Sequence, residues 1–240
     1  MSRYGPALVL VLCGGAVLRI SLFSELYLRY VQQGLRPYLI ASGVLLLVLG
    51  IVGAVVVGGG SRNEDRHEHA DGHDHSRGPR VARLLVVPAL ALLLFPPPAL
   101  GSYSAEREAA GYAAQGIGTF PALPEGDPVD LALGEFTSRA LYDSGRTMKN
   151  RTIRMTGFVT KDDEGAWYLT RLRVSCCAAD ARADRIEIRE ADAPAVDSWV
   201  SVTGTWVPKG RLGTDEAWPP VLAATDVRHV GQPENPYEKR

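Results

Sequence analysis

The stretch YLIASGVLLLVLGIVGAVVV, residues 38–57, contains no charged side chain. A helix needs roughly 20 consecutive apolar residues to cross the hydrocarbon core of a bilayer. Two further apolar runs flank it, GPALVLVLCGGAVLRISLF at residues 5–23 and LLVVPALALLLFPPPAL at residues 84–100. Arg19 lies near one end of the first run, where it can reach the headgroups. We therefore predict that residues 1–100 form an α-helical membrane region with three transmembrane helices, at about 5–23, 38–57 and 84–100.

Two of these runs have an alternative interpretation. The first could be a signal peptide, because Arg3 precedes its apolar core, but no small-x-small cleavage site follows it. The third is ended by three prolines at 96–98, and Ala99-Leu100-Gly101 resembles a processing site that would release the rest of the chain. A third span is the interpretation we favour over processing.

Small residues recur in the second run: Ser42, Gly43, Gly50, Gly53 and Ala54. Small side chains let transmembrane helices approach closely, so they could form a packing face for a partner membrane protein. Glycine is also simply frequent in such helices. The sequence leaves both explanations open.

The placement of arginines predicts the orientation of the spans, because cytoplasmic loops are enriched in Lys and Arg. With the N-terminus inside, the inner side carries Arg3 and the arginines of the loop after the second run, and the outer side carries fewer. This predicts a multi-pass membrane protein. With three spans, its C-terminal domain is extracytoplasmic.

A histidine-rich linker, residues 58–83, joins the second and third runs. Four of the five histidines of the chain lie in it, interspersed with Glu and Asp: His67, His69, His73 and His75. Imidazole and carboxylate groups together suit Zn²⁺, Ni²⁺ or Cu²⁺. The linker is therefore either a weak, exchangeable metal-binding loop or a solvated low-complexity segment whose histidines are incidental.

The rest of the chain has the pattern of a small all-β domain. A polar connector is predicted at 101–134, and the domain at 135–240 begins with a helical pattern at 135–143. Alternating apolar residues then predict five short strands, at 152–160, 166–174, 184–189, 199–207 and 221–230. Gly157 and Gly204, inside two of these strands, fit the sharp coiling that closes a small barrel. An OB-like β-barrel is the predicted fold of this domain.

Composition and motifs exclude several classes of function. The formal net charge is −1, which gives no reason to expect nucleic acid as a partner. The sequence has no phosphate-binding loop, no dinucleotide fingerprint and no arrangement that we can assign to a Ser-His-Asp triad or a carboxylate pair. We therefore predict that the protein is not an enzyme.

The chemically distinctive motif is SCCAAD, residues 175–180. Neighbouring residues of a strand face opposite sides, so Cys176 and Cys177 must lie at a bend or a strand end. They could bind Zn²⁺ with Asp180, and His229, the only histidine of this domain, could be the fourth ligand of such a site. Alternatively the two thiols could form a strained, reducible disulfide, or serve only as one buried and one small side chain.

The whole arrangement resembles the bacterial YcgQ-like family of permease subunits. The resemblance lies in LRPYLIASGVLLLVLG, the His-Asp linker, RLRVSCCAADA, WVSVTGTW and ENPY, and it extends over nearly the whole chain. It implies the smaller subunit of a two-component permease of the bacterial plasma membrane, with a polytopic permease subunit as its partner and a link to zinc supply. Cys176, Cys177 and Asp180 occupy the positions of the cysteine motif of that family.

We therefore expect an accessory subunit whose spans bind a larger membrane protein and whose domain handles a divalent metal, with Zn²⁺ as the expected cofactor. Two other classes of function remain open at this stage. One is a membrane-anchored thiol-disulfide protein, and the other is an OB-like interaction module that binds no metal.

Overall fold

The structure, a computed structural model, describes residues 4–59, 94, 98–107 and 116–238. Its contacts divide the chain into two compact units. The first consists of residues 1–27 and 33–98, and the second of residues 28–32 and 99–240. The short segment between the first two helices thus belongs to the C-terminal unit, although it is far from that unit in sequence.

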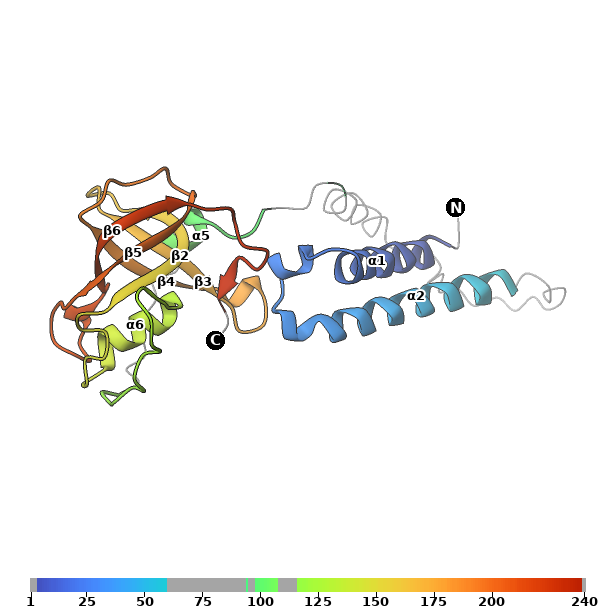
Figure 1. Cartoon of the computed structure of the whole chain (residues 1–240). Coiled ribbons are helices and arrows are strands. Elements are labelled where there is room, and N and C mark those ends of the chain that lie inside the picture. The colour runs from blue at the N-terminus through green and yellow to red at the C-terminus, as the bar shows by residue number, and fades with distance from the viewer. Residues whose placement is uncertain (1–3, 60–93, 95–97, 108–115, 239–240) are drawn as a thin grey trace. The chain divides into compact units, whose positions relative to one another are not determined.

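In the first unit, the described residues form two helices, α1 (Gly5–Leu22) and α2 (Arg36–Gly59), which lie side by side (Figure 1). Short 3₁₀ turns, η1 (Leu26–Arg29) and η2 (Gln33–Leu35), connect them. Each helix has its proline near the N-terminus, where no intrahelical hydrogen bond is lost. Both are long and apolar enough to cross a membrane. The two N-terminal spans predicted from the sequence are therefore helices of suitable length and composition.

The contact between the two helices is made by small residues. The buried residues of α1 are Ala7, Gly14 and Ser21, spaced seven apart, as is typical of a helix–helix seam. A Cβ atom added to Gly14 would lie 2.7 Å from the carbonyl oxygen of Gly43, and one added to Gly50 would lie 3.0 Å from that of Ala7. Two glycines of α2 are thus used inside the chain to pack on α1. Gly43 and Gly50 are therefore packing residues, and the helix that they contact is α1 of the same chain.

The third predicted span, 84–100, lies outside the described residues except for Leu94 and residues 98–100. The four linker histidines, His67, His69, His73 and His75, also lie outside them. The three-span prediction and the metal-binding prediction for the linker therefore stay predictions.

The second unit is rich in β-structure. Its described part has seven strands: β1 (Val129–Asp130), β2 (Thr152–Lys161), β3 (Trp167–Arg173), β4 (Arg182–Arg189), β5 (Trp199–Val207), β6 (Val221–His229) and β7 (Tyr237–Glu238). Its helices are α5 (Ser102–Arg107), α6 (Leu133–Tyr142) and the 3₁₀ turns η4 (Ala178–Asp180) and η5 (Asp215–Ala217). The five long strands lie within two residues of the ranges predicted from the alternating pattern.

The five long strands pair in a cycle. β2 pairs with β5, β5 with β6, β6 with β4, β4 with β3, and β3 again with β2. All these pairings are antiparallel except that of β4 with β6. The short strands β1 and β7 add in parallel to β2 and β3. The sheet-rich domain expected from the sequence is present, and each long strand has a neighbour on both sides.

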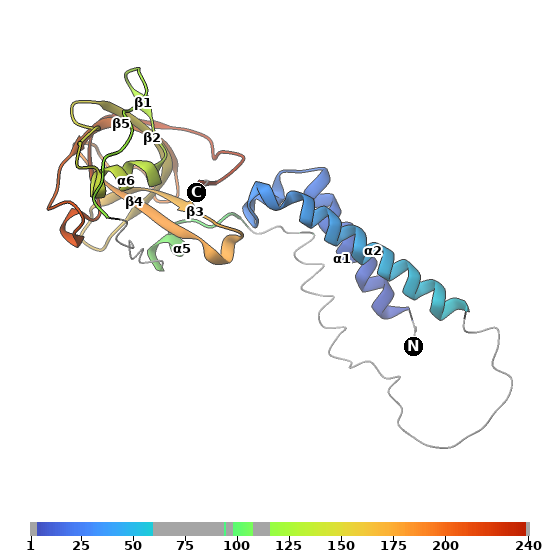
Figure 2. The ribbon, with the colours of Figure 1, turned by 90° about the horizontal axis from the view of Figure 1, so that it is seen from below.

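Helix α6 lies at one end of this sheet (Figures 1 and 2). Its apolar face follows a helical period, and Leu133, Phe136 and Ala140 join the main core together with inward residues of the strands such as Ile153 and Leu169. Leu133 and Phe136 are fully buried. The helix therefore fills the end of the core that the strands leave open.

Two glycines permit close approach between strands. A Cβ atom on Gly157 would lie 2.5 Å from the carbonyl oxygen of Thr170, and a Cβ on Gly204 would lie within 2.1 Å of that of Ala223. The β5–β6 register also shifts between Thr203 and Gly204. Both positions therefore exclude any side chain, which explains why glycine interrupts two otherwise β-branched strands.

The segment 101–134 is more than a polar connector. Its residues Leu123, Val129 and Leu131 belong to the main core, and Ala105 of α5 packs in a second cluster with Phe158. Apolar residues spaced without a regular period carry no signal of secondary structure. The sequence pattern therefore missed that this segment is part of the domain.

Glu238, the last described residue, binds the start of helix α6. The Glu238 carboxylate accepts hydrogen bonds from the backbone N–H groups of Leu133 (2.8 Å) and Gly134 (3.1 Å), the first two residues of α6. These groups have no partner inside the helix, and the helix dipole favours a negative charge there. Burial raises the pKa of Glu238, against the lowering effect of these two N–H groups and of Arg171.

Replacement of Glu238 by Ala is expected to destabilise the C-terminal unit by about 1–2 kcal/mol, because two N–H donors lose their acceptor. All four tryptophans of the chain lie in this unit, at 167, 199, 206 and 218. Thermal unfolding of the full chain in mild detergent, followed by tryptophan fluorescence, therefore reports on it. Glu234→Ala, an exposed position nearby, is the matched control.

The same assay in Glu238→Gln tests how the contribution of Glu238 to stability changes with pH. A raised folded-state pKa means that the folded state binds the proton more tightly than the unfolded chain, so this contribution is lost as pH rises through the folded pKa. The free energy of unfolding of the unmodified chain, minus that of Glu238→Gln, should fall as pH rises above 4.5. A value that instead rises with pH would contradict the assignment.

Candidate functional site

The two adjacent cysteines lie on a bend between β3 and β4. Cys177 has an extended backbone with φ −151° and ψ 171°, and η4 begins directly after it. Cys176 is exposed and Cys177 half-buried, both are free thiols, and their Sγ atoms are 3.6 Å apart. The prediction that neighbouring thiols require a bend or a strand end is confirmed.

Asp180 holds this bend in place. Its Oδ1 accepts the backbone N–H of Ser175 (2.9 Å) and its Oδ2 that of Cys176 (2.8 Å). A hydrogen bond from the Cys176 thiol, together with these backbone donors, lowers the pKa of Asp180. Both carboxylate oxygens are thus used in fixing the loop. Asp180 therefore acts here as a clamp on the cysteine loop.

The same contact suppresses ionisation of the thiol. The hydrogen bond to the Asp180 carboxylate is the main cause that raises the pKa of Cys176 to about 11, and Cys177 adds to it. The thiolate is the nucleophilic and metal-binding form of cysteine. Cys176 is therefore a protonated thiol at neutral pH unless something removes its proton.

The cysteine bend pairs with the segment between α1 and α2. The N–H of Gln32 donates to the carbonyl oxygen of Cys176 (3.0 Å), and the N–H of Ala178 donates to that of Tyr30 (2.8 Å). Val31 and Cys177 form an isolated antiparallel bridge. The backbone around the two thiols is therefore shaped by a segment about 145 positions earlier in the sequence.

Tyr237 adds a further link on the same segment. Its hydroxyl donates to the carbonyl oxygen of Arg29 (2.8 Å) and accepts the N–H of Leu100 (3.3 Å). The ring is buried in the second core cluster with Leu172 and Val174. Three stretches of the chain thus meet at one buried tyrosine.

The structure does not bring the four predicted ligands, Cys176, Cys177, Asp180 and His229, together as a site. His229 lies in β6 opposite Val200, beside a pocket whose lining includes neither cysteine. Among the described residues, no group of three or more His, Cys, Asp or Glu side chains is arranged to hold a metal ion. Of the four, Cys176, Cys177 and Asp180 lie together in the bend, and His229 lies apart from them.

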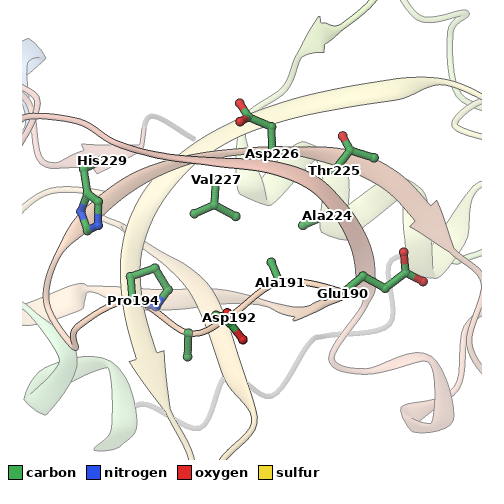
Figure 3. Close-up of a pocket in the computed structure, with 10 residues that line it drawn as sticks. Glu190, Ala191, Asp192, Pro194, Ala224, Thr225, Asp226, Val227 and His229 are labelled. Atoms are coloured by element: carbon green, nitrogen blue, oxygen red, sulfur yellow. The ribbon is translucent and has the colours of Figure 1, made fainter.

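That pocket was missed by sequence reasoning. It has a volume of about 400 Å³ and lies between β6 and the loop that follows β4 (Figure 3). Its lining includes Glu190, Asp192 and Asp226. The acidic residues come from two segments far apart in sequence, so no local motif marks them.

Two family matches cover most of the chain. Residues 8–111 match the DUF1980 N-terminal domain, and residues 137–238 match the DUF1980 C-terminal domain. No curated protein and no solved structure matches the chain. The chain therefore matches the models of both DUF1980 domains, in the order that their names imply.

Replacement of Asp180 by Asn is expected to lower the pKa of Cys176 from about 11 towards its ordinary value, because the negative charge beside the thiol is removed. The measurement is the rate of alkylation by iodoacetamide against pH, in a Cys13→Ser, Cys177→Ser background. The midpoint of the profile should move to lower pH.

The midpoint of the alkylation profile also distinguishes loss of the Asp180 charge from increased mobility of the loop. A loop that is only more mobile would raise the rate at every pH without moving the midpoint. An unchanged midpoint in Asp180→Asn would show that the carboxylate does not control the thiol.

Proposed function

We propose that this chain, with its pair of DUF1980 domains, is a membrane-anchored accessory subunit of a bacterial two-component permease. Its domain outside the membrane presents Cys176 and Cys177 to a thiophilic divalent cation such as Zn²⁺. The observation that carries the proposal is the pair of adjacent free thiols, one exposed and one half-buried, on a fixed bend. The permease role itself rests on the resemblance of the sequence to the smaller subunit of such systems.

The raised pKa of Cys176 counts against rapid thiol-disulfide exchange at neutral pH. Thiols that exchange disulfides rapidly at neutral pH have a lowered pKa, whereas this one is raised to about 11. A bound cation lowers the pKa of its ligand and replaces the proton. Metal binding at this pair is therefore expected to weaken as pH falls, since cation and protons compete for the sulfurs.

Two sulfur ligands suit transfer rather than permanent storage. Structural zinc sites use four protein ligands, whereas sites with fewer leave positions for water or an incoming group. Asp180 is already occupied by two backbone N–H groups. The remaining positions are therefore available to water or to ligands of the larger subunit, which allows the ion to be passed on.

The chain path supports a third membrane crossing. Residues 28–32, between α1 and α2, belong to the same unit as residues 99–240. If α1 and α2 both span the bilayer, α2 ends at Gly59 on the side opposite to residues 28–32. The chain must then cross once more before residue 99. The apolar run within 84–100 is the segment of suitable length, and the arginine distribution puts the domain outside.

We further propose that the domain is an OB-like barrel. The support is the cyclic pairing of five strands with a parallel contact between β4 and β6, and a helix at one end of the core. OB-folds are five-stranded, partly open Greek-key barrels. This description explains why pairing between β4 and β6 is short, at only three register pairs.

The surface of the helix pair supports a membrane environment with a partner. Large apolar side chains of α2 are exposed, including Leu45, Val52 and Val55. Lipid tails satisfy such a surface, and a polytopic subunit can cover part of it. The seam with α1 already uses Gly43 and Gly50, so the partner would contact the other faces of α2.

Cadmium titration of the full chain, purified in mild detergent without a His tag, tests the thiol site. Cd²⁺ bound to thiolates gives a sulfur-to-metal charge-transfer band in the ultraviolet, which histidine ligands do not produce. We expect the band in the unmodified chain and in a variant with all four linker histidines replaced by Ala. It should be absent in Cys176→Ser, Cys177→Ser.

Cys13→Ser is the matched control and should retain the band. A band that survives in the double Cys176, Cys177 variant would remove the pair from metal binding. Absence of any band in the unmodified chain would leave the linker as the metal candidate and would favour an interaction module.

A further inference from the structure

The edge of β6 is open along its second half. Pairing between β4 and β6 ends at Arg189 and Ala223, although β6 continues to His229. Glu190, the next residue after β4, has a left-handed backbone with φ 64°. The chain therefore turns away from β6 at this point and leaves a gap beside the strand.

Backbone groups of β6 face this gap. The N–H of Val230 donates to the carbonyl oxygen of Trp199, so Val230 points its backbone groups towards β5. Because these groups alternate along an antiparallel ladder, Val227 and His229 point theirs to the opposite side. No strand among the described residues pairs with β6 there. Two donors and two acceptors therefore form an unused sheet edge.

The gap is a groove, and the loop after β4 forms the side opposite β6. The indole Nε1 of Trp167 donates to the carbonyl oxygen of Ala191 (2.9 Å), which holds the loop after β4. Ala191 and Val227 pack against the main core and line the groove floor (Figure 3). The volume of about 400 Å³ has room for a few residues of an extended chain.

The groove is acidic. Glu190, Asp192 and Asp226 line it, and its lining contains no Lys or Arg. Arg228 pairs with Asp226 (Nε to Oδ2, 2.6 Å), but both side chains are exposed and such a pair contributes little. The charge of the site therefore favours a cationic ligand.

We propose that this groove binds an extended basic peptide segment of a protein partner, which adds as a strand to the open edge of β6. Strand addition supplies affinity through main-chain hydrogen bonds and specificity through alternate side chains. On β6, Ala224 and Val227 pack on the core side and Asp226 lies on the other. A segment that alternates small apolar residues with Lys or Arg matches both faces. This proposal is independent of metal binding at the cysteines.

The test uses the full chain in mild detergent and a fluorescent peptide of alternating Lys and Val, with binding followed by anisotropy. Two peptides of equal length serve as comparisons, one with Glu in place of Lys and one with alternate backbone nitrogens methylated. We expect the Lys-Val peptide to bind and both others to bind at least tenfold more weakly. Hydrogen exchange at Val227 and His229 should slow in the complex.

Two variants locate the binding. The triple change Glu190→Gln, Asp192→Asn and Asp226→Asn removes the groove charge, and Val227→Pro removes an edge N–H that β5 does not use. Each should weaken binding at least tenfold. The matched control removes three exposed carboxylates elsewhere, Asp163→Asn, Glu164→Gln and Glu234→Gln, and should change binding less than twofold.

Tryptophan fluorescence shows whether each variant keeps its fold. Equal losses in the groove triple and the control triple would show unspecific charge attraction and overturn the proposal. Full binding of the methylated peptide, or no binding of the Lys-Val peptide to the folded chain, would also overturn it.

Discussion

The proposed topology depends on two backbone hydrogen bonds, one between Gln32 and Cys176 and one between Ala178 and Tyr30. They join the cysteine bend to the segment between the first two helices. The hydroxyl of Tyr237 reinforces them by donating to Arg29. Because both segments belong to one unit, they must lie on the same side of any membrane that α1 and α2 cross. The proposed third crossing rests on this constraint, whereas the proposed orientation rests on the placement of arginines in the sequence.

Local chemistry then defines what the cysteine bend can do. Asp180 fixes the loop through two N–H groups, and the same carboxylate keeps Cys176 protonated. Asp180 thus fixes the position of the two cysteines and also keeps the Cys176 thiol unreactive at neutral pH. Such a pair is unsuited to rapid disulfide exchange, and any cation that binds it must displace the proton. This relation explains why an aspartate three residues after Cys177 forms part of the motif.

The sequence predicted those features that depend on local periodicity. Apolar runs predicted α1 and α2, and alternating residues predicted the five long strands, because each pattern repeats within the element itself. The bend at Cys176 and Cys177 followed from the opposite faces of neighbouring strand residues. Gly157 and Gly204 were expected to allow sharp coiling of their strands, and the structure shows that a side chain at either position would meet the neighbouring strand.

Features that depend on long-range contacts were not accessible in this way. The role of Gly43 and Gly50 became clear only when α1 was placed beside them, and core residues such as Leu131 lie in a segment without periodic pattern. The suggestion that His229 completes a site with the cysteines rested on its being the only histidine of the domain. Its position depends on the β5–β6 ladder, which carries it to the groove of β6. The acidic groove was missed for the same reason, since its walls are 30 or more residues apart.

The most direct test of the account introduces a single cysteine, by Gly34→Cys or Glu234→Cys, into a background without native cysteines. The measurement is the side of the membrane on which each cysteine lies. Both positions are exposed, and a Cβ atom at Gly34 meets no neighbour. Labelling with an impermeant maleimide, in right-side-out and inside-out vesicles, should modify both from the outer side, and a third cysteine from Ser61→Cys from the inner side. Labelling of Gly34→Cys and Glu234→Cys from opposite sides would contradict the pairing on which the account rests.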